Sequence, residues 1–280
     1  MRLITWNIQW ARGMDGRVDP ERIVAQARGM ADFDILCLQE VADNFPDLAG
    51  NGPGNQFGEL ARLLPGYTAV EGVALDIPDE SGRRKRFGNM LLSRYPVQQV
   101  LRHLLPWEAD ATRNMPRVLI EATVMAPFGP VRVMTTHLEY SSGLIRRAQV
   151  EGIREAHRAA CARLDRPREP GLGTYVVTPT ARSAILTGDF NMKPEDPTKQ
   201  RLSEPFAGGT PALLDAWAIN RPGLPHPASF CVYDQTYGAP HCCDFIFVTQ
   251  DLVGRITRVD YSTATRASDH QPVLIEIEDR

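Results

Sequence analysis

Several polar side chains of this 280-residue sequence follow directly after short apolar runs, where strand ends bring side chains to the rim of a sheet. Asn7 follows Leu-Ile-Thr-Trp, Glu40 follows Ile-Leu-Cys-Leu-Gln, His137 follows Val-Met-Thr-Thr and Asp189 follows Ile-Leu-Thr-Gly. Carboxylates can hold a hard divalent cation, and an acid or a histidine can activate a water molecule. With donors for the charge on phosphoryl oxygens, these groups are what hydrolysis of a phosphoester requires.

Each of these residues alone has an ordinary structural explanation. Asn7 could cap a turn, His137 could be a hydrogen-bonded core histidine, and Glu40 could lie in solvent at a strand end. The set is harder to explain in this way, because a carboxylate behind an apolar strand is costly to bury unless it is paired or metal-bound. The number of acids in such positions therefore favours a functional site.

Six short motifs are spread over nearly the whole chain: Thr5-Trp6-Asn7-Ile8, Leu38-Gln39-Glu40-Val41, Thr136-His137-Leu138, Gly188-Asp189-Phe190-Asn191, Cys243-Asp244-Phe245-Ile246-Phe247 and Ser268-Asp269-His270. Their order and spacing resemble those of the endonuclease/exonuclease/phosphatase superfamily, whose members are deoxyribonuclease I-like, metal-dependent phosphoesterases. The Gly-Asp-Phe-Asn and Ser-Asp-His elements are the most specific of the six.

The resemblance implies a site for a hard divalent cation. Glu40 would be the principal ligand of Mg²⁺ or Mn²⁺, cations that keep several waters and take few protein ligands. Asn7 would lie beside Glu40 and bind the metal or its water, and Asp269 would complete the metal region.

The same resemblance implies which residues act on the phosphate. Asp189 would hold and activate the attacking water, and Asn191, two residues later on an extended segment, would donate to a phosphoryl oxygen. His137 would contact the phosphate, and His270 would face the scissile phosphate as a base, an acid or a hydrogen-bond donor. Asp244 would accept a hydrogen bond from the histidine ring and fix its tautomer.

Weaker features point to substrate contacts. Asn89, in a Gly-Asn-Met-Leu-Leu-Ser-Arg segment, and Arg117, in Pro-Arg-Val, are expected to line the cleft and bind substrate. The basic run 83–86 follows a turn-like segment and could reach toward a polyanion or be a solvated loop. Aromatic residues in candidate rim loops could stack on bases or simply pack locally; they are Trp107, Trp217, Tyr140, Phe230 and Tyr233.

Hydrophobic patterns predict the elements that must position these residues. Strands are expected at 2–8, 35–39, 67–73, 89–93, 118–124, 131–137, 183–187, 243–248 and 273–277. Helices are expected at 20–30, 56–64 and 142–164, and loops at 167–179 and 192–209. Strand clusters with intervening helices predict one domain over 1–280 of the α/β class (α+β type), a four-layered sandwich of two mainly antiparallel sheets packed face to face and flanked by helices.

Composition limits the class of protein. A net charge of −3 argues against a broad basic surface that coats nucleic acid, although a local basic groove is compatible with it. The N-terminal residues lack a charged segment followed by an apolar one, and no 18-residue apolar window occurs, so we expect a cytoplasmic monomer without stable membrane association. Five cysteines without a CxxC pair indicate reduced thiols, and one of the vicinal pair Cys242 and Cys243 is expected to face the core and the other not.

The favoured function is therefore divalent-metal-dependent hydrolysis of phosphoesters, with phosphodiesters of DNA or RNA ahead of other substrates. One alternative is a phosphatase or phosphodiesterase that acts on a lipid head group, an inositol or another small phosphoester. Another is a catalytically silent binding or scaffold protein, against which the intact set of acids argues. A metal-independent hydrolase with a serine or cysteine nucleophile and a histidine lacks support, because no Gly-x-Ser-x-Gly element is present and no cysteine lies in a pattern that indicates an activated thiolate.

Overall fold

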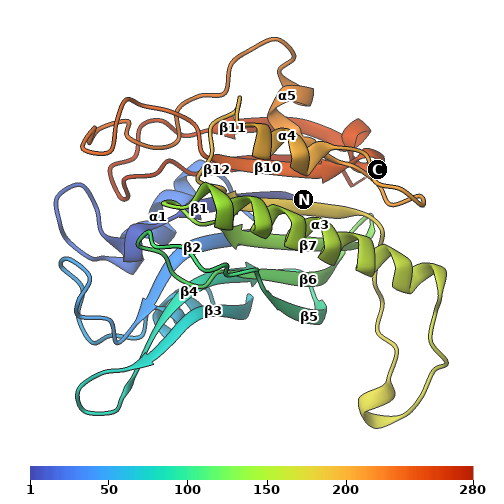
Figure 1. Ribbon diagram of the computed structural model, residues 1–280, viewed down its shortest axis with the longest axis horizontal. Helices are drawn as coiled ribbons and strands as arrows, with labels where there is room; N and C mark the ends of the chain where they lie inside the picture. Colours follow the sequence, from blue (N-terminus) through green and yellow to red (C-terminus); the bar gives the residue numbers. More distant parts are fainter. Residues whose placement is uncertain (280) are drawn as a thin grey trace.

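The computed structural model describes residues 1–279 and is built around two β-sheets that pack against each other (Figure 1). The strands are β1 (Arg2–Asn7), β2 (Ile35–Asp43), β3 (Thr68–Pro78), β4 (Arg84–Ser93), β5 (Val97–Leu104), β6 (Val118–Ala126), β7 (Gly129–His137), β8 (Ala184–Asp189), β9 (Leu213–Asp215), β10 (Asp244–Thr249), β11 (Ile256–Tyr261) and β12 (Val273–Ile277). One six-stranded sheet has the order β11-β12-β1-β2-β4-β3, and the other has the order β5-β6-β7-β8-β10-β9.

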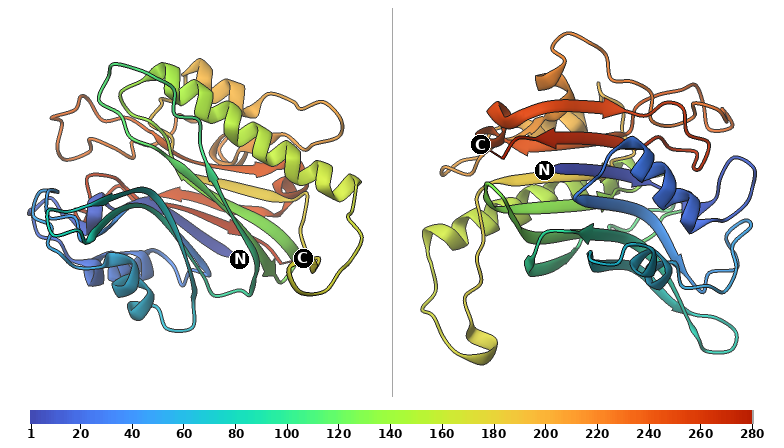
Figure 2. Two further views of the ribbon diagram at one scale, coloured as in Figure 1. Left: turned by 60° about the horizontal axis from the view of Figure 1, so that its bottom comes forward. Right: turned by 180° about the vertical axis from the view of Figure 1, so that it is seen from behind.

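Helices cover the outer faces of the sheets (Figure 2). They are α1 (Pro20–Met30), α2 (Gln56–Leu63), α3 (Gly143–Asp165), α4 (Pro197–Ser203) and α5 (Ala216–Asn220). Helix α1 begins where Asp19 accepts from the backbone N–H of Arg22 and Pro20 supplies a preformed φ, as expected for an N-terminus. Its buried side chains join those of α2 in a core against the first sheet, whereas Val150 and Ile153 of α3 pack in the core of the second.

Each sheet has one parallel pair at its centre, β1 with β2 and β7 with β8, and all other neighbouring strands are antiparallel. The strands of a parallel pair end at the same edge of a sheet. His137 at the end of β7 is opposite Asp189 at the end of β8, and Asp244, the first residue of antiparallel β10, is opposite Asp189 on its other side. The topology thus brings chain-distant polar residues to one edge.

Two local irregularities of the backbone occur at this edge. Strand β2 carries a bulge between Leu38 and Val41, and Glu40 within it has a φ of 61°, which is unusual for a residue with a side chain. Gly188 on β8 has a φ of 144°, and a Cβ there would collide with the carbonyl oxygen of Thr136 on β7. Only glycine permits β7 and β8 to approach this closely beside Asp189.

The predicted sandwich of two sheets flanked by helices is confirmed, with differences in its smaller elements. Strands β5, β9 and β11 were not predicted; β5 is an edge strand whose apolar and polar residues do not alternate regularly, and β9 has only three residues. The expectation of a continuous loop over 192–209 was wrong, because α4 forms there on Pro197 with Asp196 as its cap. No helix in residues 1–279 is long and apolar enough to cross a lipid bilayer.

Candidate active site

A cavity of about 270 Å³ opens at the edge where β1, β2, β7 and β8 end. Seven of the predicted site residues line it: Glu40, Arg117, His137, Asp189, Asn191, Asp269 and His270. Asn7 and Asp244 lie directly behind them and are almost completely buried. The structure therefore brings nine of the ten candidate residues into one cluster.

Asn7 bridges two of the carboxylates. Its side-chain Nδ2 donates to Asp189 Oδ2 at 2.9 Å and to Glu40 Oε1 at 3.2 Å. Its Oδ1 accepts from the backbone N–H of Gln9 at 3.0 Å. With these partners the amide holds the two acids side by side, in addition to the place beside Glu40 that the sequence predicts.

The metal-region acids repel one another. Burial, the charge of Asp269 and that of Asp189 raise the pKa of Glu40 to about 7, although the Asn7 hydrogen bond and His270 oppose the rise. Burial likewise raises the pKa of Asp269, whose Oδ2 accepts from Gln9 Nε2 at 2.7 Å. A divalent cation among these oxygens would remove the repulsion.

Asp189 carries a stable negative charge at neutral pH. Burial opposes that charge, but cationic His270 and the N–H groups of Asn7 and Asn191 outweigh it and hold the pKa of the carboxyl below its usual range. The nearest imidazole nitrogens, His137 Nε2 and His270 Nε2, lie 3.5 and 3.6 Å from Asp189 Oδ2.

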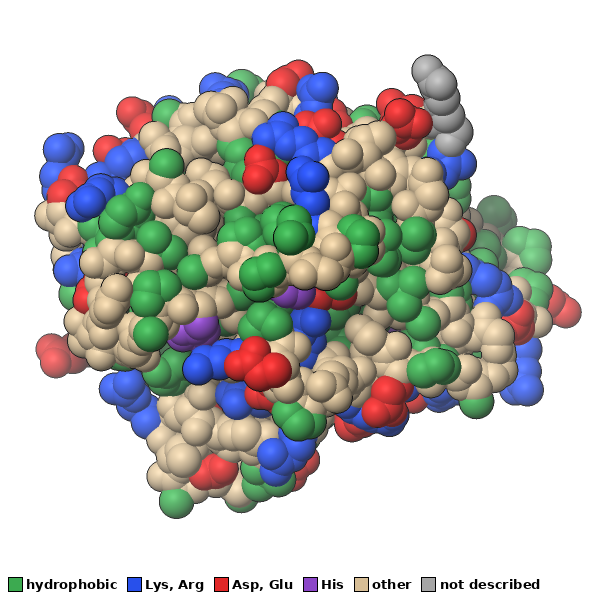
Figure 3. Space-filling model, turned by 90° about the horizontal axis from the view of Figure 1, so that it is seen from above, with side chains coloured by type: hydrophobic (Ala, Val, Ile, Leu, Met, Phe, Trp, Pro, Cys, Tyr) green, Lys and Arg blue, Asp and Glu red, His purple; other side chains and the backbone are tan. Residues whose placement is uncertain are grey.

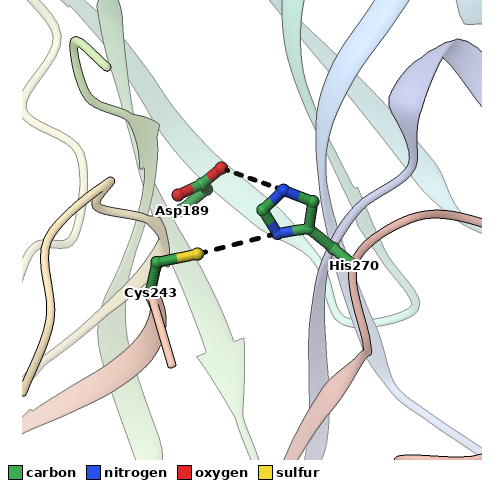
Figure 4. A group of neighbouring side chains, drawn as sticks. All are labelled: Asp189, Cys243 and His270. Atoms are coloured by element: carbon green, nitrogen blue, oxygen red, sulfur yellow. Dashed lines mark hydrogen bonds and ion pairs between the residues drawn. The ribbon is translucent and has the colours of Figure 1, made fainter. Parts of the chain in front are cut away.

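His270 forms a dyad with Asp244. The ring nitrogen Nδ1 lies 2.8 Å from Asp244 Oδ2, and Asp244 and Asp189 raise the pKa of His270 well above its usual value against the opposing effect of burial. Ser229 supports the dyad, because its hydroxyl donates to Asp244 Oδ2 at 2.7 Å. The arrangement fixes the His270 ring with Nε2 directed toward Asp189 (Figure 4).

His137 is neutral at physiological pH. Burial and the charges of Arg117 and His270 lower the pKa of His137 to about 3. Asn191 Nδ2 lies 3.0 Å from His137 Nε2 and donates to the carbonyl of Leu138 at 3.0 Å. The expectation that Asn191 continues an extended segment was wrong, since its φ is 50° and its backbone N–H folds back onto Asp189. Its side-chain nitrogen therefore lies between His137 and the Leu138 carbonyl.

The two substrate-binding candidates differ. Arg117 is buried beside the cavity, its Nη2 lies 3.5 Å from Glu139 Oε2, and its Nε has no partner within the described residues. Asn89 does not line the cavity, contrary to prediction, because its side chain lies between the sheets and donates to the carbonyl of Val118 at 3.0 Å.

The remaining candidates are the aromatic residues and the basic run 83–86, and only some of them lie at the cavity. Among the predicted aromatic residues, Tyr140 and Phe230 line the cavity, whereas Trp107, Trp217 and Tyr233 do not. The basic run is neither a free loop nor an open binding surface, because every one of its side chains pairs with an acid: Arg83 with Asp79, Arg84 with Asp76, Lys85 with Asp47 and Arg86 with Asp43.

All five cysteines are buried and free. Of the vicinal pair, Cys242 packs in the main core and Cys243 lies in a separate small cluster beside the cavity, although both are buried. Cys243 packs with Phe230 and Cys231, and its Sγ lies 3.9 Å from His270 Nδ1 (Figure 4). Donor atoms of Asp189, Cys243 and His270 lie within 4.8 Å of one another.

Sequence reasoning missed several residues of the site. Gln9, Trp10, Arg113 and Tyr237 line the cavity, and Ser229 holds Asp244 from behind. Gln9 lies two residues after Asn7 and could have been included with that motif. Trp10, Tyr237 and Ser229 are single residues in irregular segments, and no local pattern marks them.

The donor set fits a hard divalent cation. Glu40, Asp269 and Asp189 contribute carboxylate oxygens around one cavity, which is the ligand chemistry that Mg²⁺ and Mn²⁺ prefer. The pKa of Glu40 is raised first by burial and then by the charge of Asp269, and a bound cation would oppose both effects.

Comparisons with known proteins agree with this arrangement. The model of the Endonuclease/Exonuclease/phosphatase family matches residues 4–270. An endonuclease/exonuclease/phosphatase from Beutenbergia cavernae is 27% identical, with a TM-score of 0.67 over 98% of this chain and 70% of that chain. A mannosyl-6-phosphatase from Bacteroides thetaiotaomicron is 16% identical, with a TM-score of 0.65 over 99% of each chain. D. rerio TDP2 complexed with single strand DNA product is 16% identical, with a TM-score of 0.64 over 98% and 97%. No curated protein matches the chain.

Proposed function

This chain belongs to the endonuclease/exonuclease/phosphatase family, and we propose that it hydrolyses phosphoesters with the help of a divalent cation. The observation that carries the proposal is the convergence of three carboxylates and two histidines with opposite protonation states on one small cavity. Apart from the metal and the chemistry, nothing in the fold needs these groups together.

Glu40 and Asp269 would hold the cation, with Asn7 setting the position of the Glu40 carboxylate. A cation bound there supplies a Lewis acid that polarises a phosphoryl oxygen and offsets its negative charge. Gln9 would orient Asp269 through the hydrogen bond that it donates to Oδ2.

Asp189 would orient the attacking water and accept its proton. The low pKa of its carboxyl keeps it ionised, and hydrogen bonds from Asn7 and Asn191 fix both of its oxygens. A positioned carboxylate of this kind acts as a general base when the water lies within hydrogen-bond reach.

His270 would act on the phosphoryl group as a cation. Because Asp244 stabilises its protonated form, Nδ1–H donates to Asp244 while Nε2–H is available to donate to a phosphoryl oxygen or to the leaving group. Neutral His137 and the side chain of Arg117 would add polar contacts at the cavity that both line. Donors aimed at developing charge supply much of the acceleration in such reactions.

We propose phosphodiesters of nucleic acid as the first substrate class and a small phosphoester as the second. The second is favoured by the size of the cavity and by the ion pairs that occupy the basic run 83–86. On the face drawn in Figure 3, basic and acidic side chains are interspersed and form no broad basic field. The mannosyl-6-phosphatase and the TDP2 complex have the same fold, so the fold does not choose between the two classes.

Purified protein should be assayed with Mg²⁺ on single- and double-stranded DNA, RNA, sugar and inositol phosphates, a phospholipid and an aryl phosphodiester. We expect hydrolysis of at least one substrate by the wild type and loss of that activity in Asp189→Asn. The exposed Glu80→Gln variant serves as a matched control for loss of a carboxylate. A chain that hydrolyses none of them, or an Asp189→Asn variant with full activity, would refute the proposal in favour of a silent binding protein.

A further inference from the structure

Three near-parallel aromatic rings connect the catalytic centre to the rim of the cavity. The Phe230 ring stacks on the His270 imidazole with centroids 4.4 Å apart and 27° between planes. Tyr237 stacks on Phe230 with centroids 6.2 Å apart and 22° between planes. We call His270, Phe230 and Tyr237 the aromatic column.

The inner part of the column is rigid and its outer part is open. Phe230 is only 8% exposed, and its backbone pairs with His241 and His270, which locks the ring against the imidazole. Tyr237 is 60% exposed and still lines the cavity. Within residues 1–279 the Tyr237 ring stacks on no aromatic ring other than Phe230, so its exposed surface is available to a ligand.

Trp10 supplies a second aromatic wall of the same cavity. Its φ is 44°, between Gln9 at 47° and Ala11 at 60°, and its indole Nε1 donates to the carbonyl of Ala49 at 3.0 Å. Three successive residues with side chains in the left-handed region are costly, and such strain persists where the surrounding structure holds a functional conformation. The turn therefore holds the Trp10 ring at the cavity.

Resting on the phosphoesterase function proposed above, we propose that the substrate is a nucleotide phosphoester whose unpaired base stacks on the outer end of the aromatic column. Single-stranded nucleic acid and a free nucleotide share this chemistry. Every base has a π-face, so aromatic side chains bind unpaired bases with little regard to sequence.

The other substrate classes fit this surface less well. The cavity of about 270 Å³ has the size of a small-ligand site, which favours one nucleotide over a base pair with its stacked neighbours. Polyol phosphates need side-chain partners for their hydroxyls, and the two amides that line the cavity, Gln9 and Asn191, already donate to Asp269 and toward His137. The exposed rings that line the cavity are those of Tyr140 and Tyr237.

The test compares substrates that differ only in the base. One pair is the dinucleotide of thymidine and its analogue in which hydrogen replaces both bases; the other is thymidine 5′-phosphate and deoxyribose 5-phosphate. A blunt DNA duplex completes the set. We expect kcat/KM to be about tenfold or more higher for the base-bearing member of one pair, since one base–aromatic stack has that order of effect. The pair that discriminates identifies the source.

Variants assign the effect to the column. Tyr237→Ala should bring the ratio of base-bearing to abasic kcat/KM close to one, and Tyr237→Phe should preserve it. Tyr233→Ala is the matched control, because Tyr233 lies in the same segment but its hydroxyl donates to Thr263 and its ring does not line the cavity.

The inference would be overturned if the wild type hydrolysed both members of each pair equally or preferred the duplex. It would also be overturned if Tyr237→Ala still preferred the base-bearing substrate. These outcomes would leave phosphoester hydrolysis itself intact. Absence of metal-dependent hydrolysis of every substrate would instead remove the proposed function on which the inference rests.

Discussion

Glu40→Gln should stabilise the metal-free protein, although it removes the carboxylate that we propose as the principal metal ligand. The pKa of Glu40 rises from an ordinary 4.5 to about 7, chiefly through burial and then through Asp269. Above pH 7 Glu40 is ionised in both states, but only in the folded state does its charge cost free energy, because there it is buried near Asp269. Glutamine keeps the shape and the acceptor for Asn7 Nδ2 while removing the charge.

The expected gain follows from that pKa. At about 1.4 kcal/mol for each tenfold change in ionisation, the rise corresponds to roughly 3 kcal/mol at pH 8. Near pH 5 folded Glu40 is protonated, the unfolded residue is only partly ionised, and the gain falls to about 1 kcal/mol. A carboxyl whose pKa is raised on folding destabilises the folded state, and this destabilisation grows as the pH rises from the pKa of the unfolded state to that of the folded state.

Urea denaturation in a chelating buffer at pH 8 and pH 5 measures the effect, with Glu80→Gln as the exposed control. The midpoint for Glu40→Gln at pH 8 should rise by about 1 M if the denaturant slope is about 3 kcal/mol/M. Mg²⁺ should then stabilise the wild type more than the variant. A variant no more stable than the wild type at pH 8, or equally favoured at both pH values, would refute this account of the metal region.

Three further predictions follow from the site. Asp189→Ala and His270→Ala should each lower kcat by at least about 100-fold, whereas Asp244→Ala, which acts through the imidazole, should cost about 10- to 100-fold; equal losses in steady-state assays would contradict the assigned roles. Because the pKa of His270 is raised, kcat should persist above pH 6.5 and fall only when the imidazolium deprotonates in alkali; a pH–rate profile that falls near pH 6.5 would exclude the protonated form. Gly188→Ala should destabilise the fold by about 2 to 4 kcal/mol through collision with β7, whereas Gly29→Ala in α1, where a Cβ meets nothing, should be neutral or stabilising; thermal unfolding of the two variants compares them.

The motifs at strand ends predicted which residues lie together, because strand topology makes them neighbours. Parallel pairing of β7 with β8 places His137 beside Asp189, so two motifs far apart in sequence become one wall. The same logic explains the correct sandwich, since long apolar or alternating runs dominate the central strands.

Local backbone conformation could not be predicted from the same patterns. The extended geometry expected for Asn191 is replaced by a left-handed turn, and Asn89 is directed between the sheets by the register of β4 with β3 and β2. Both errors concern where a side chain points, which depends on bulges and turns that apolar periodicity does not encode.

Contacts made by isolated loop residues were also beyond sequence reasoning. Ser229 reaches Asp244 across 15 residues, and Gln9 reaches Asp269 across 260. A single serine or glutamine in an irregular segment has no distinguishing pattern, so these supports become visible only once the fold brings the segments together.

The most direct test of the account is the rate of phosphoester hydrolysis by one preparation before chelation, after chelation, and after Mg²⁺ or Mn²⁺ is restored. The account predicts activity that disappears on chelation and returns with the hard cation, and that never appears in Asp189→Asn treated in parallel. Hydrolysis that survives complete removal of divalent metal would contradict it.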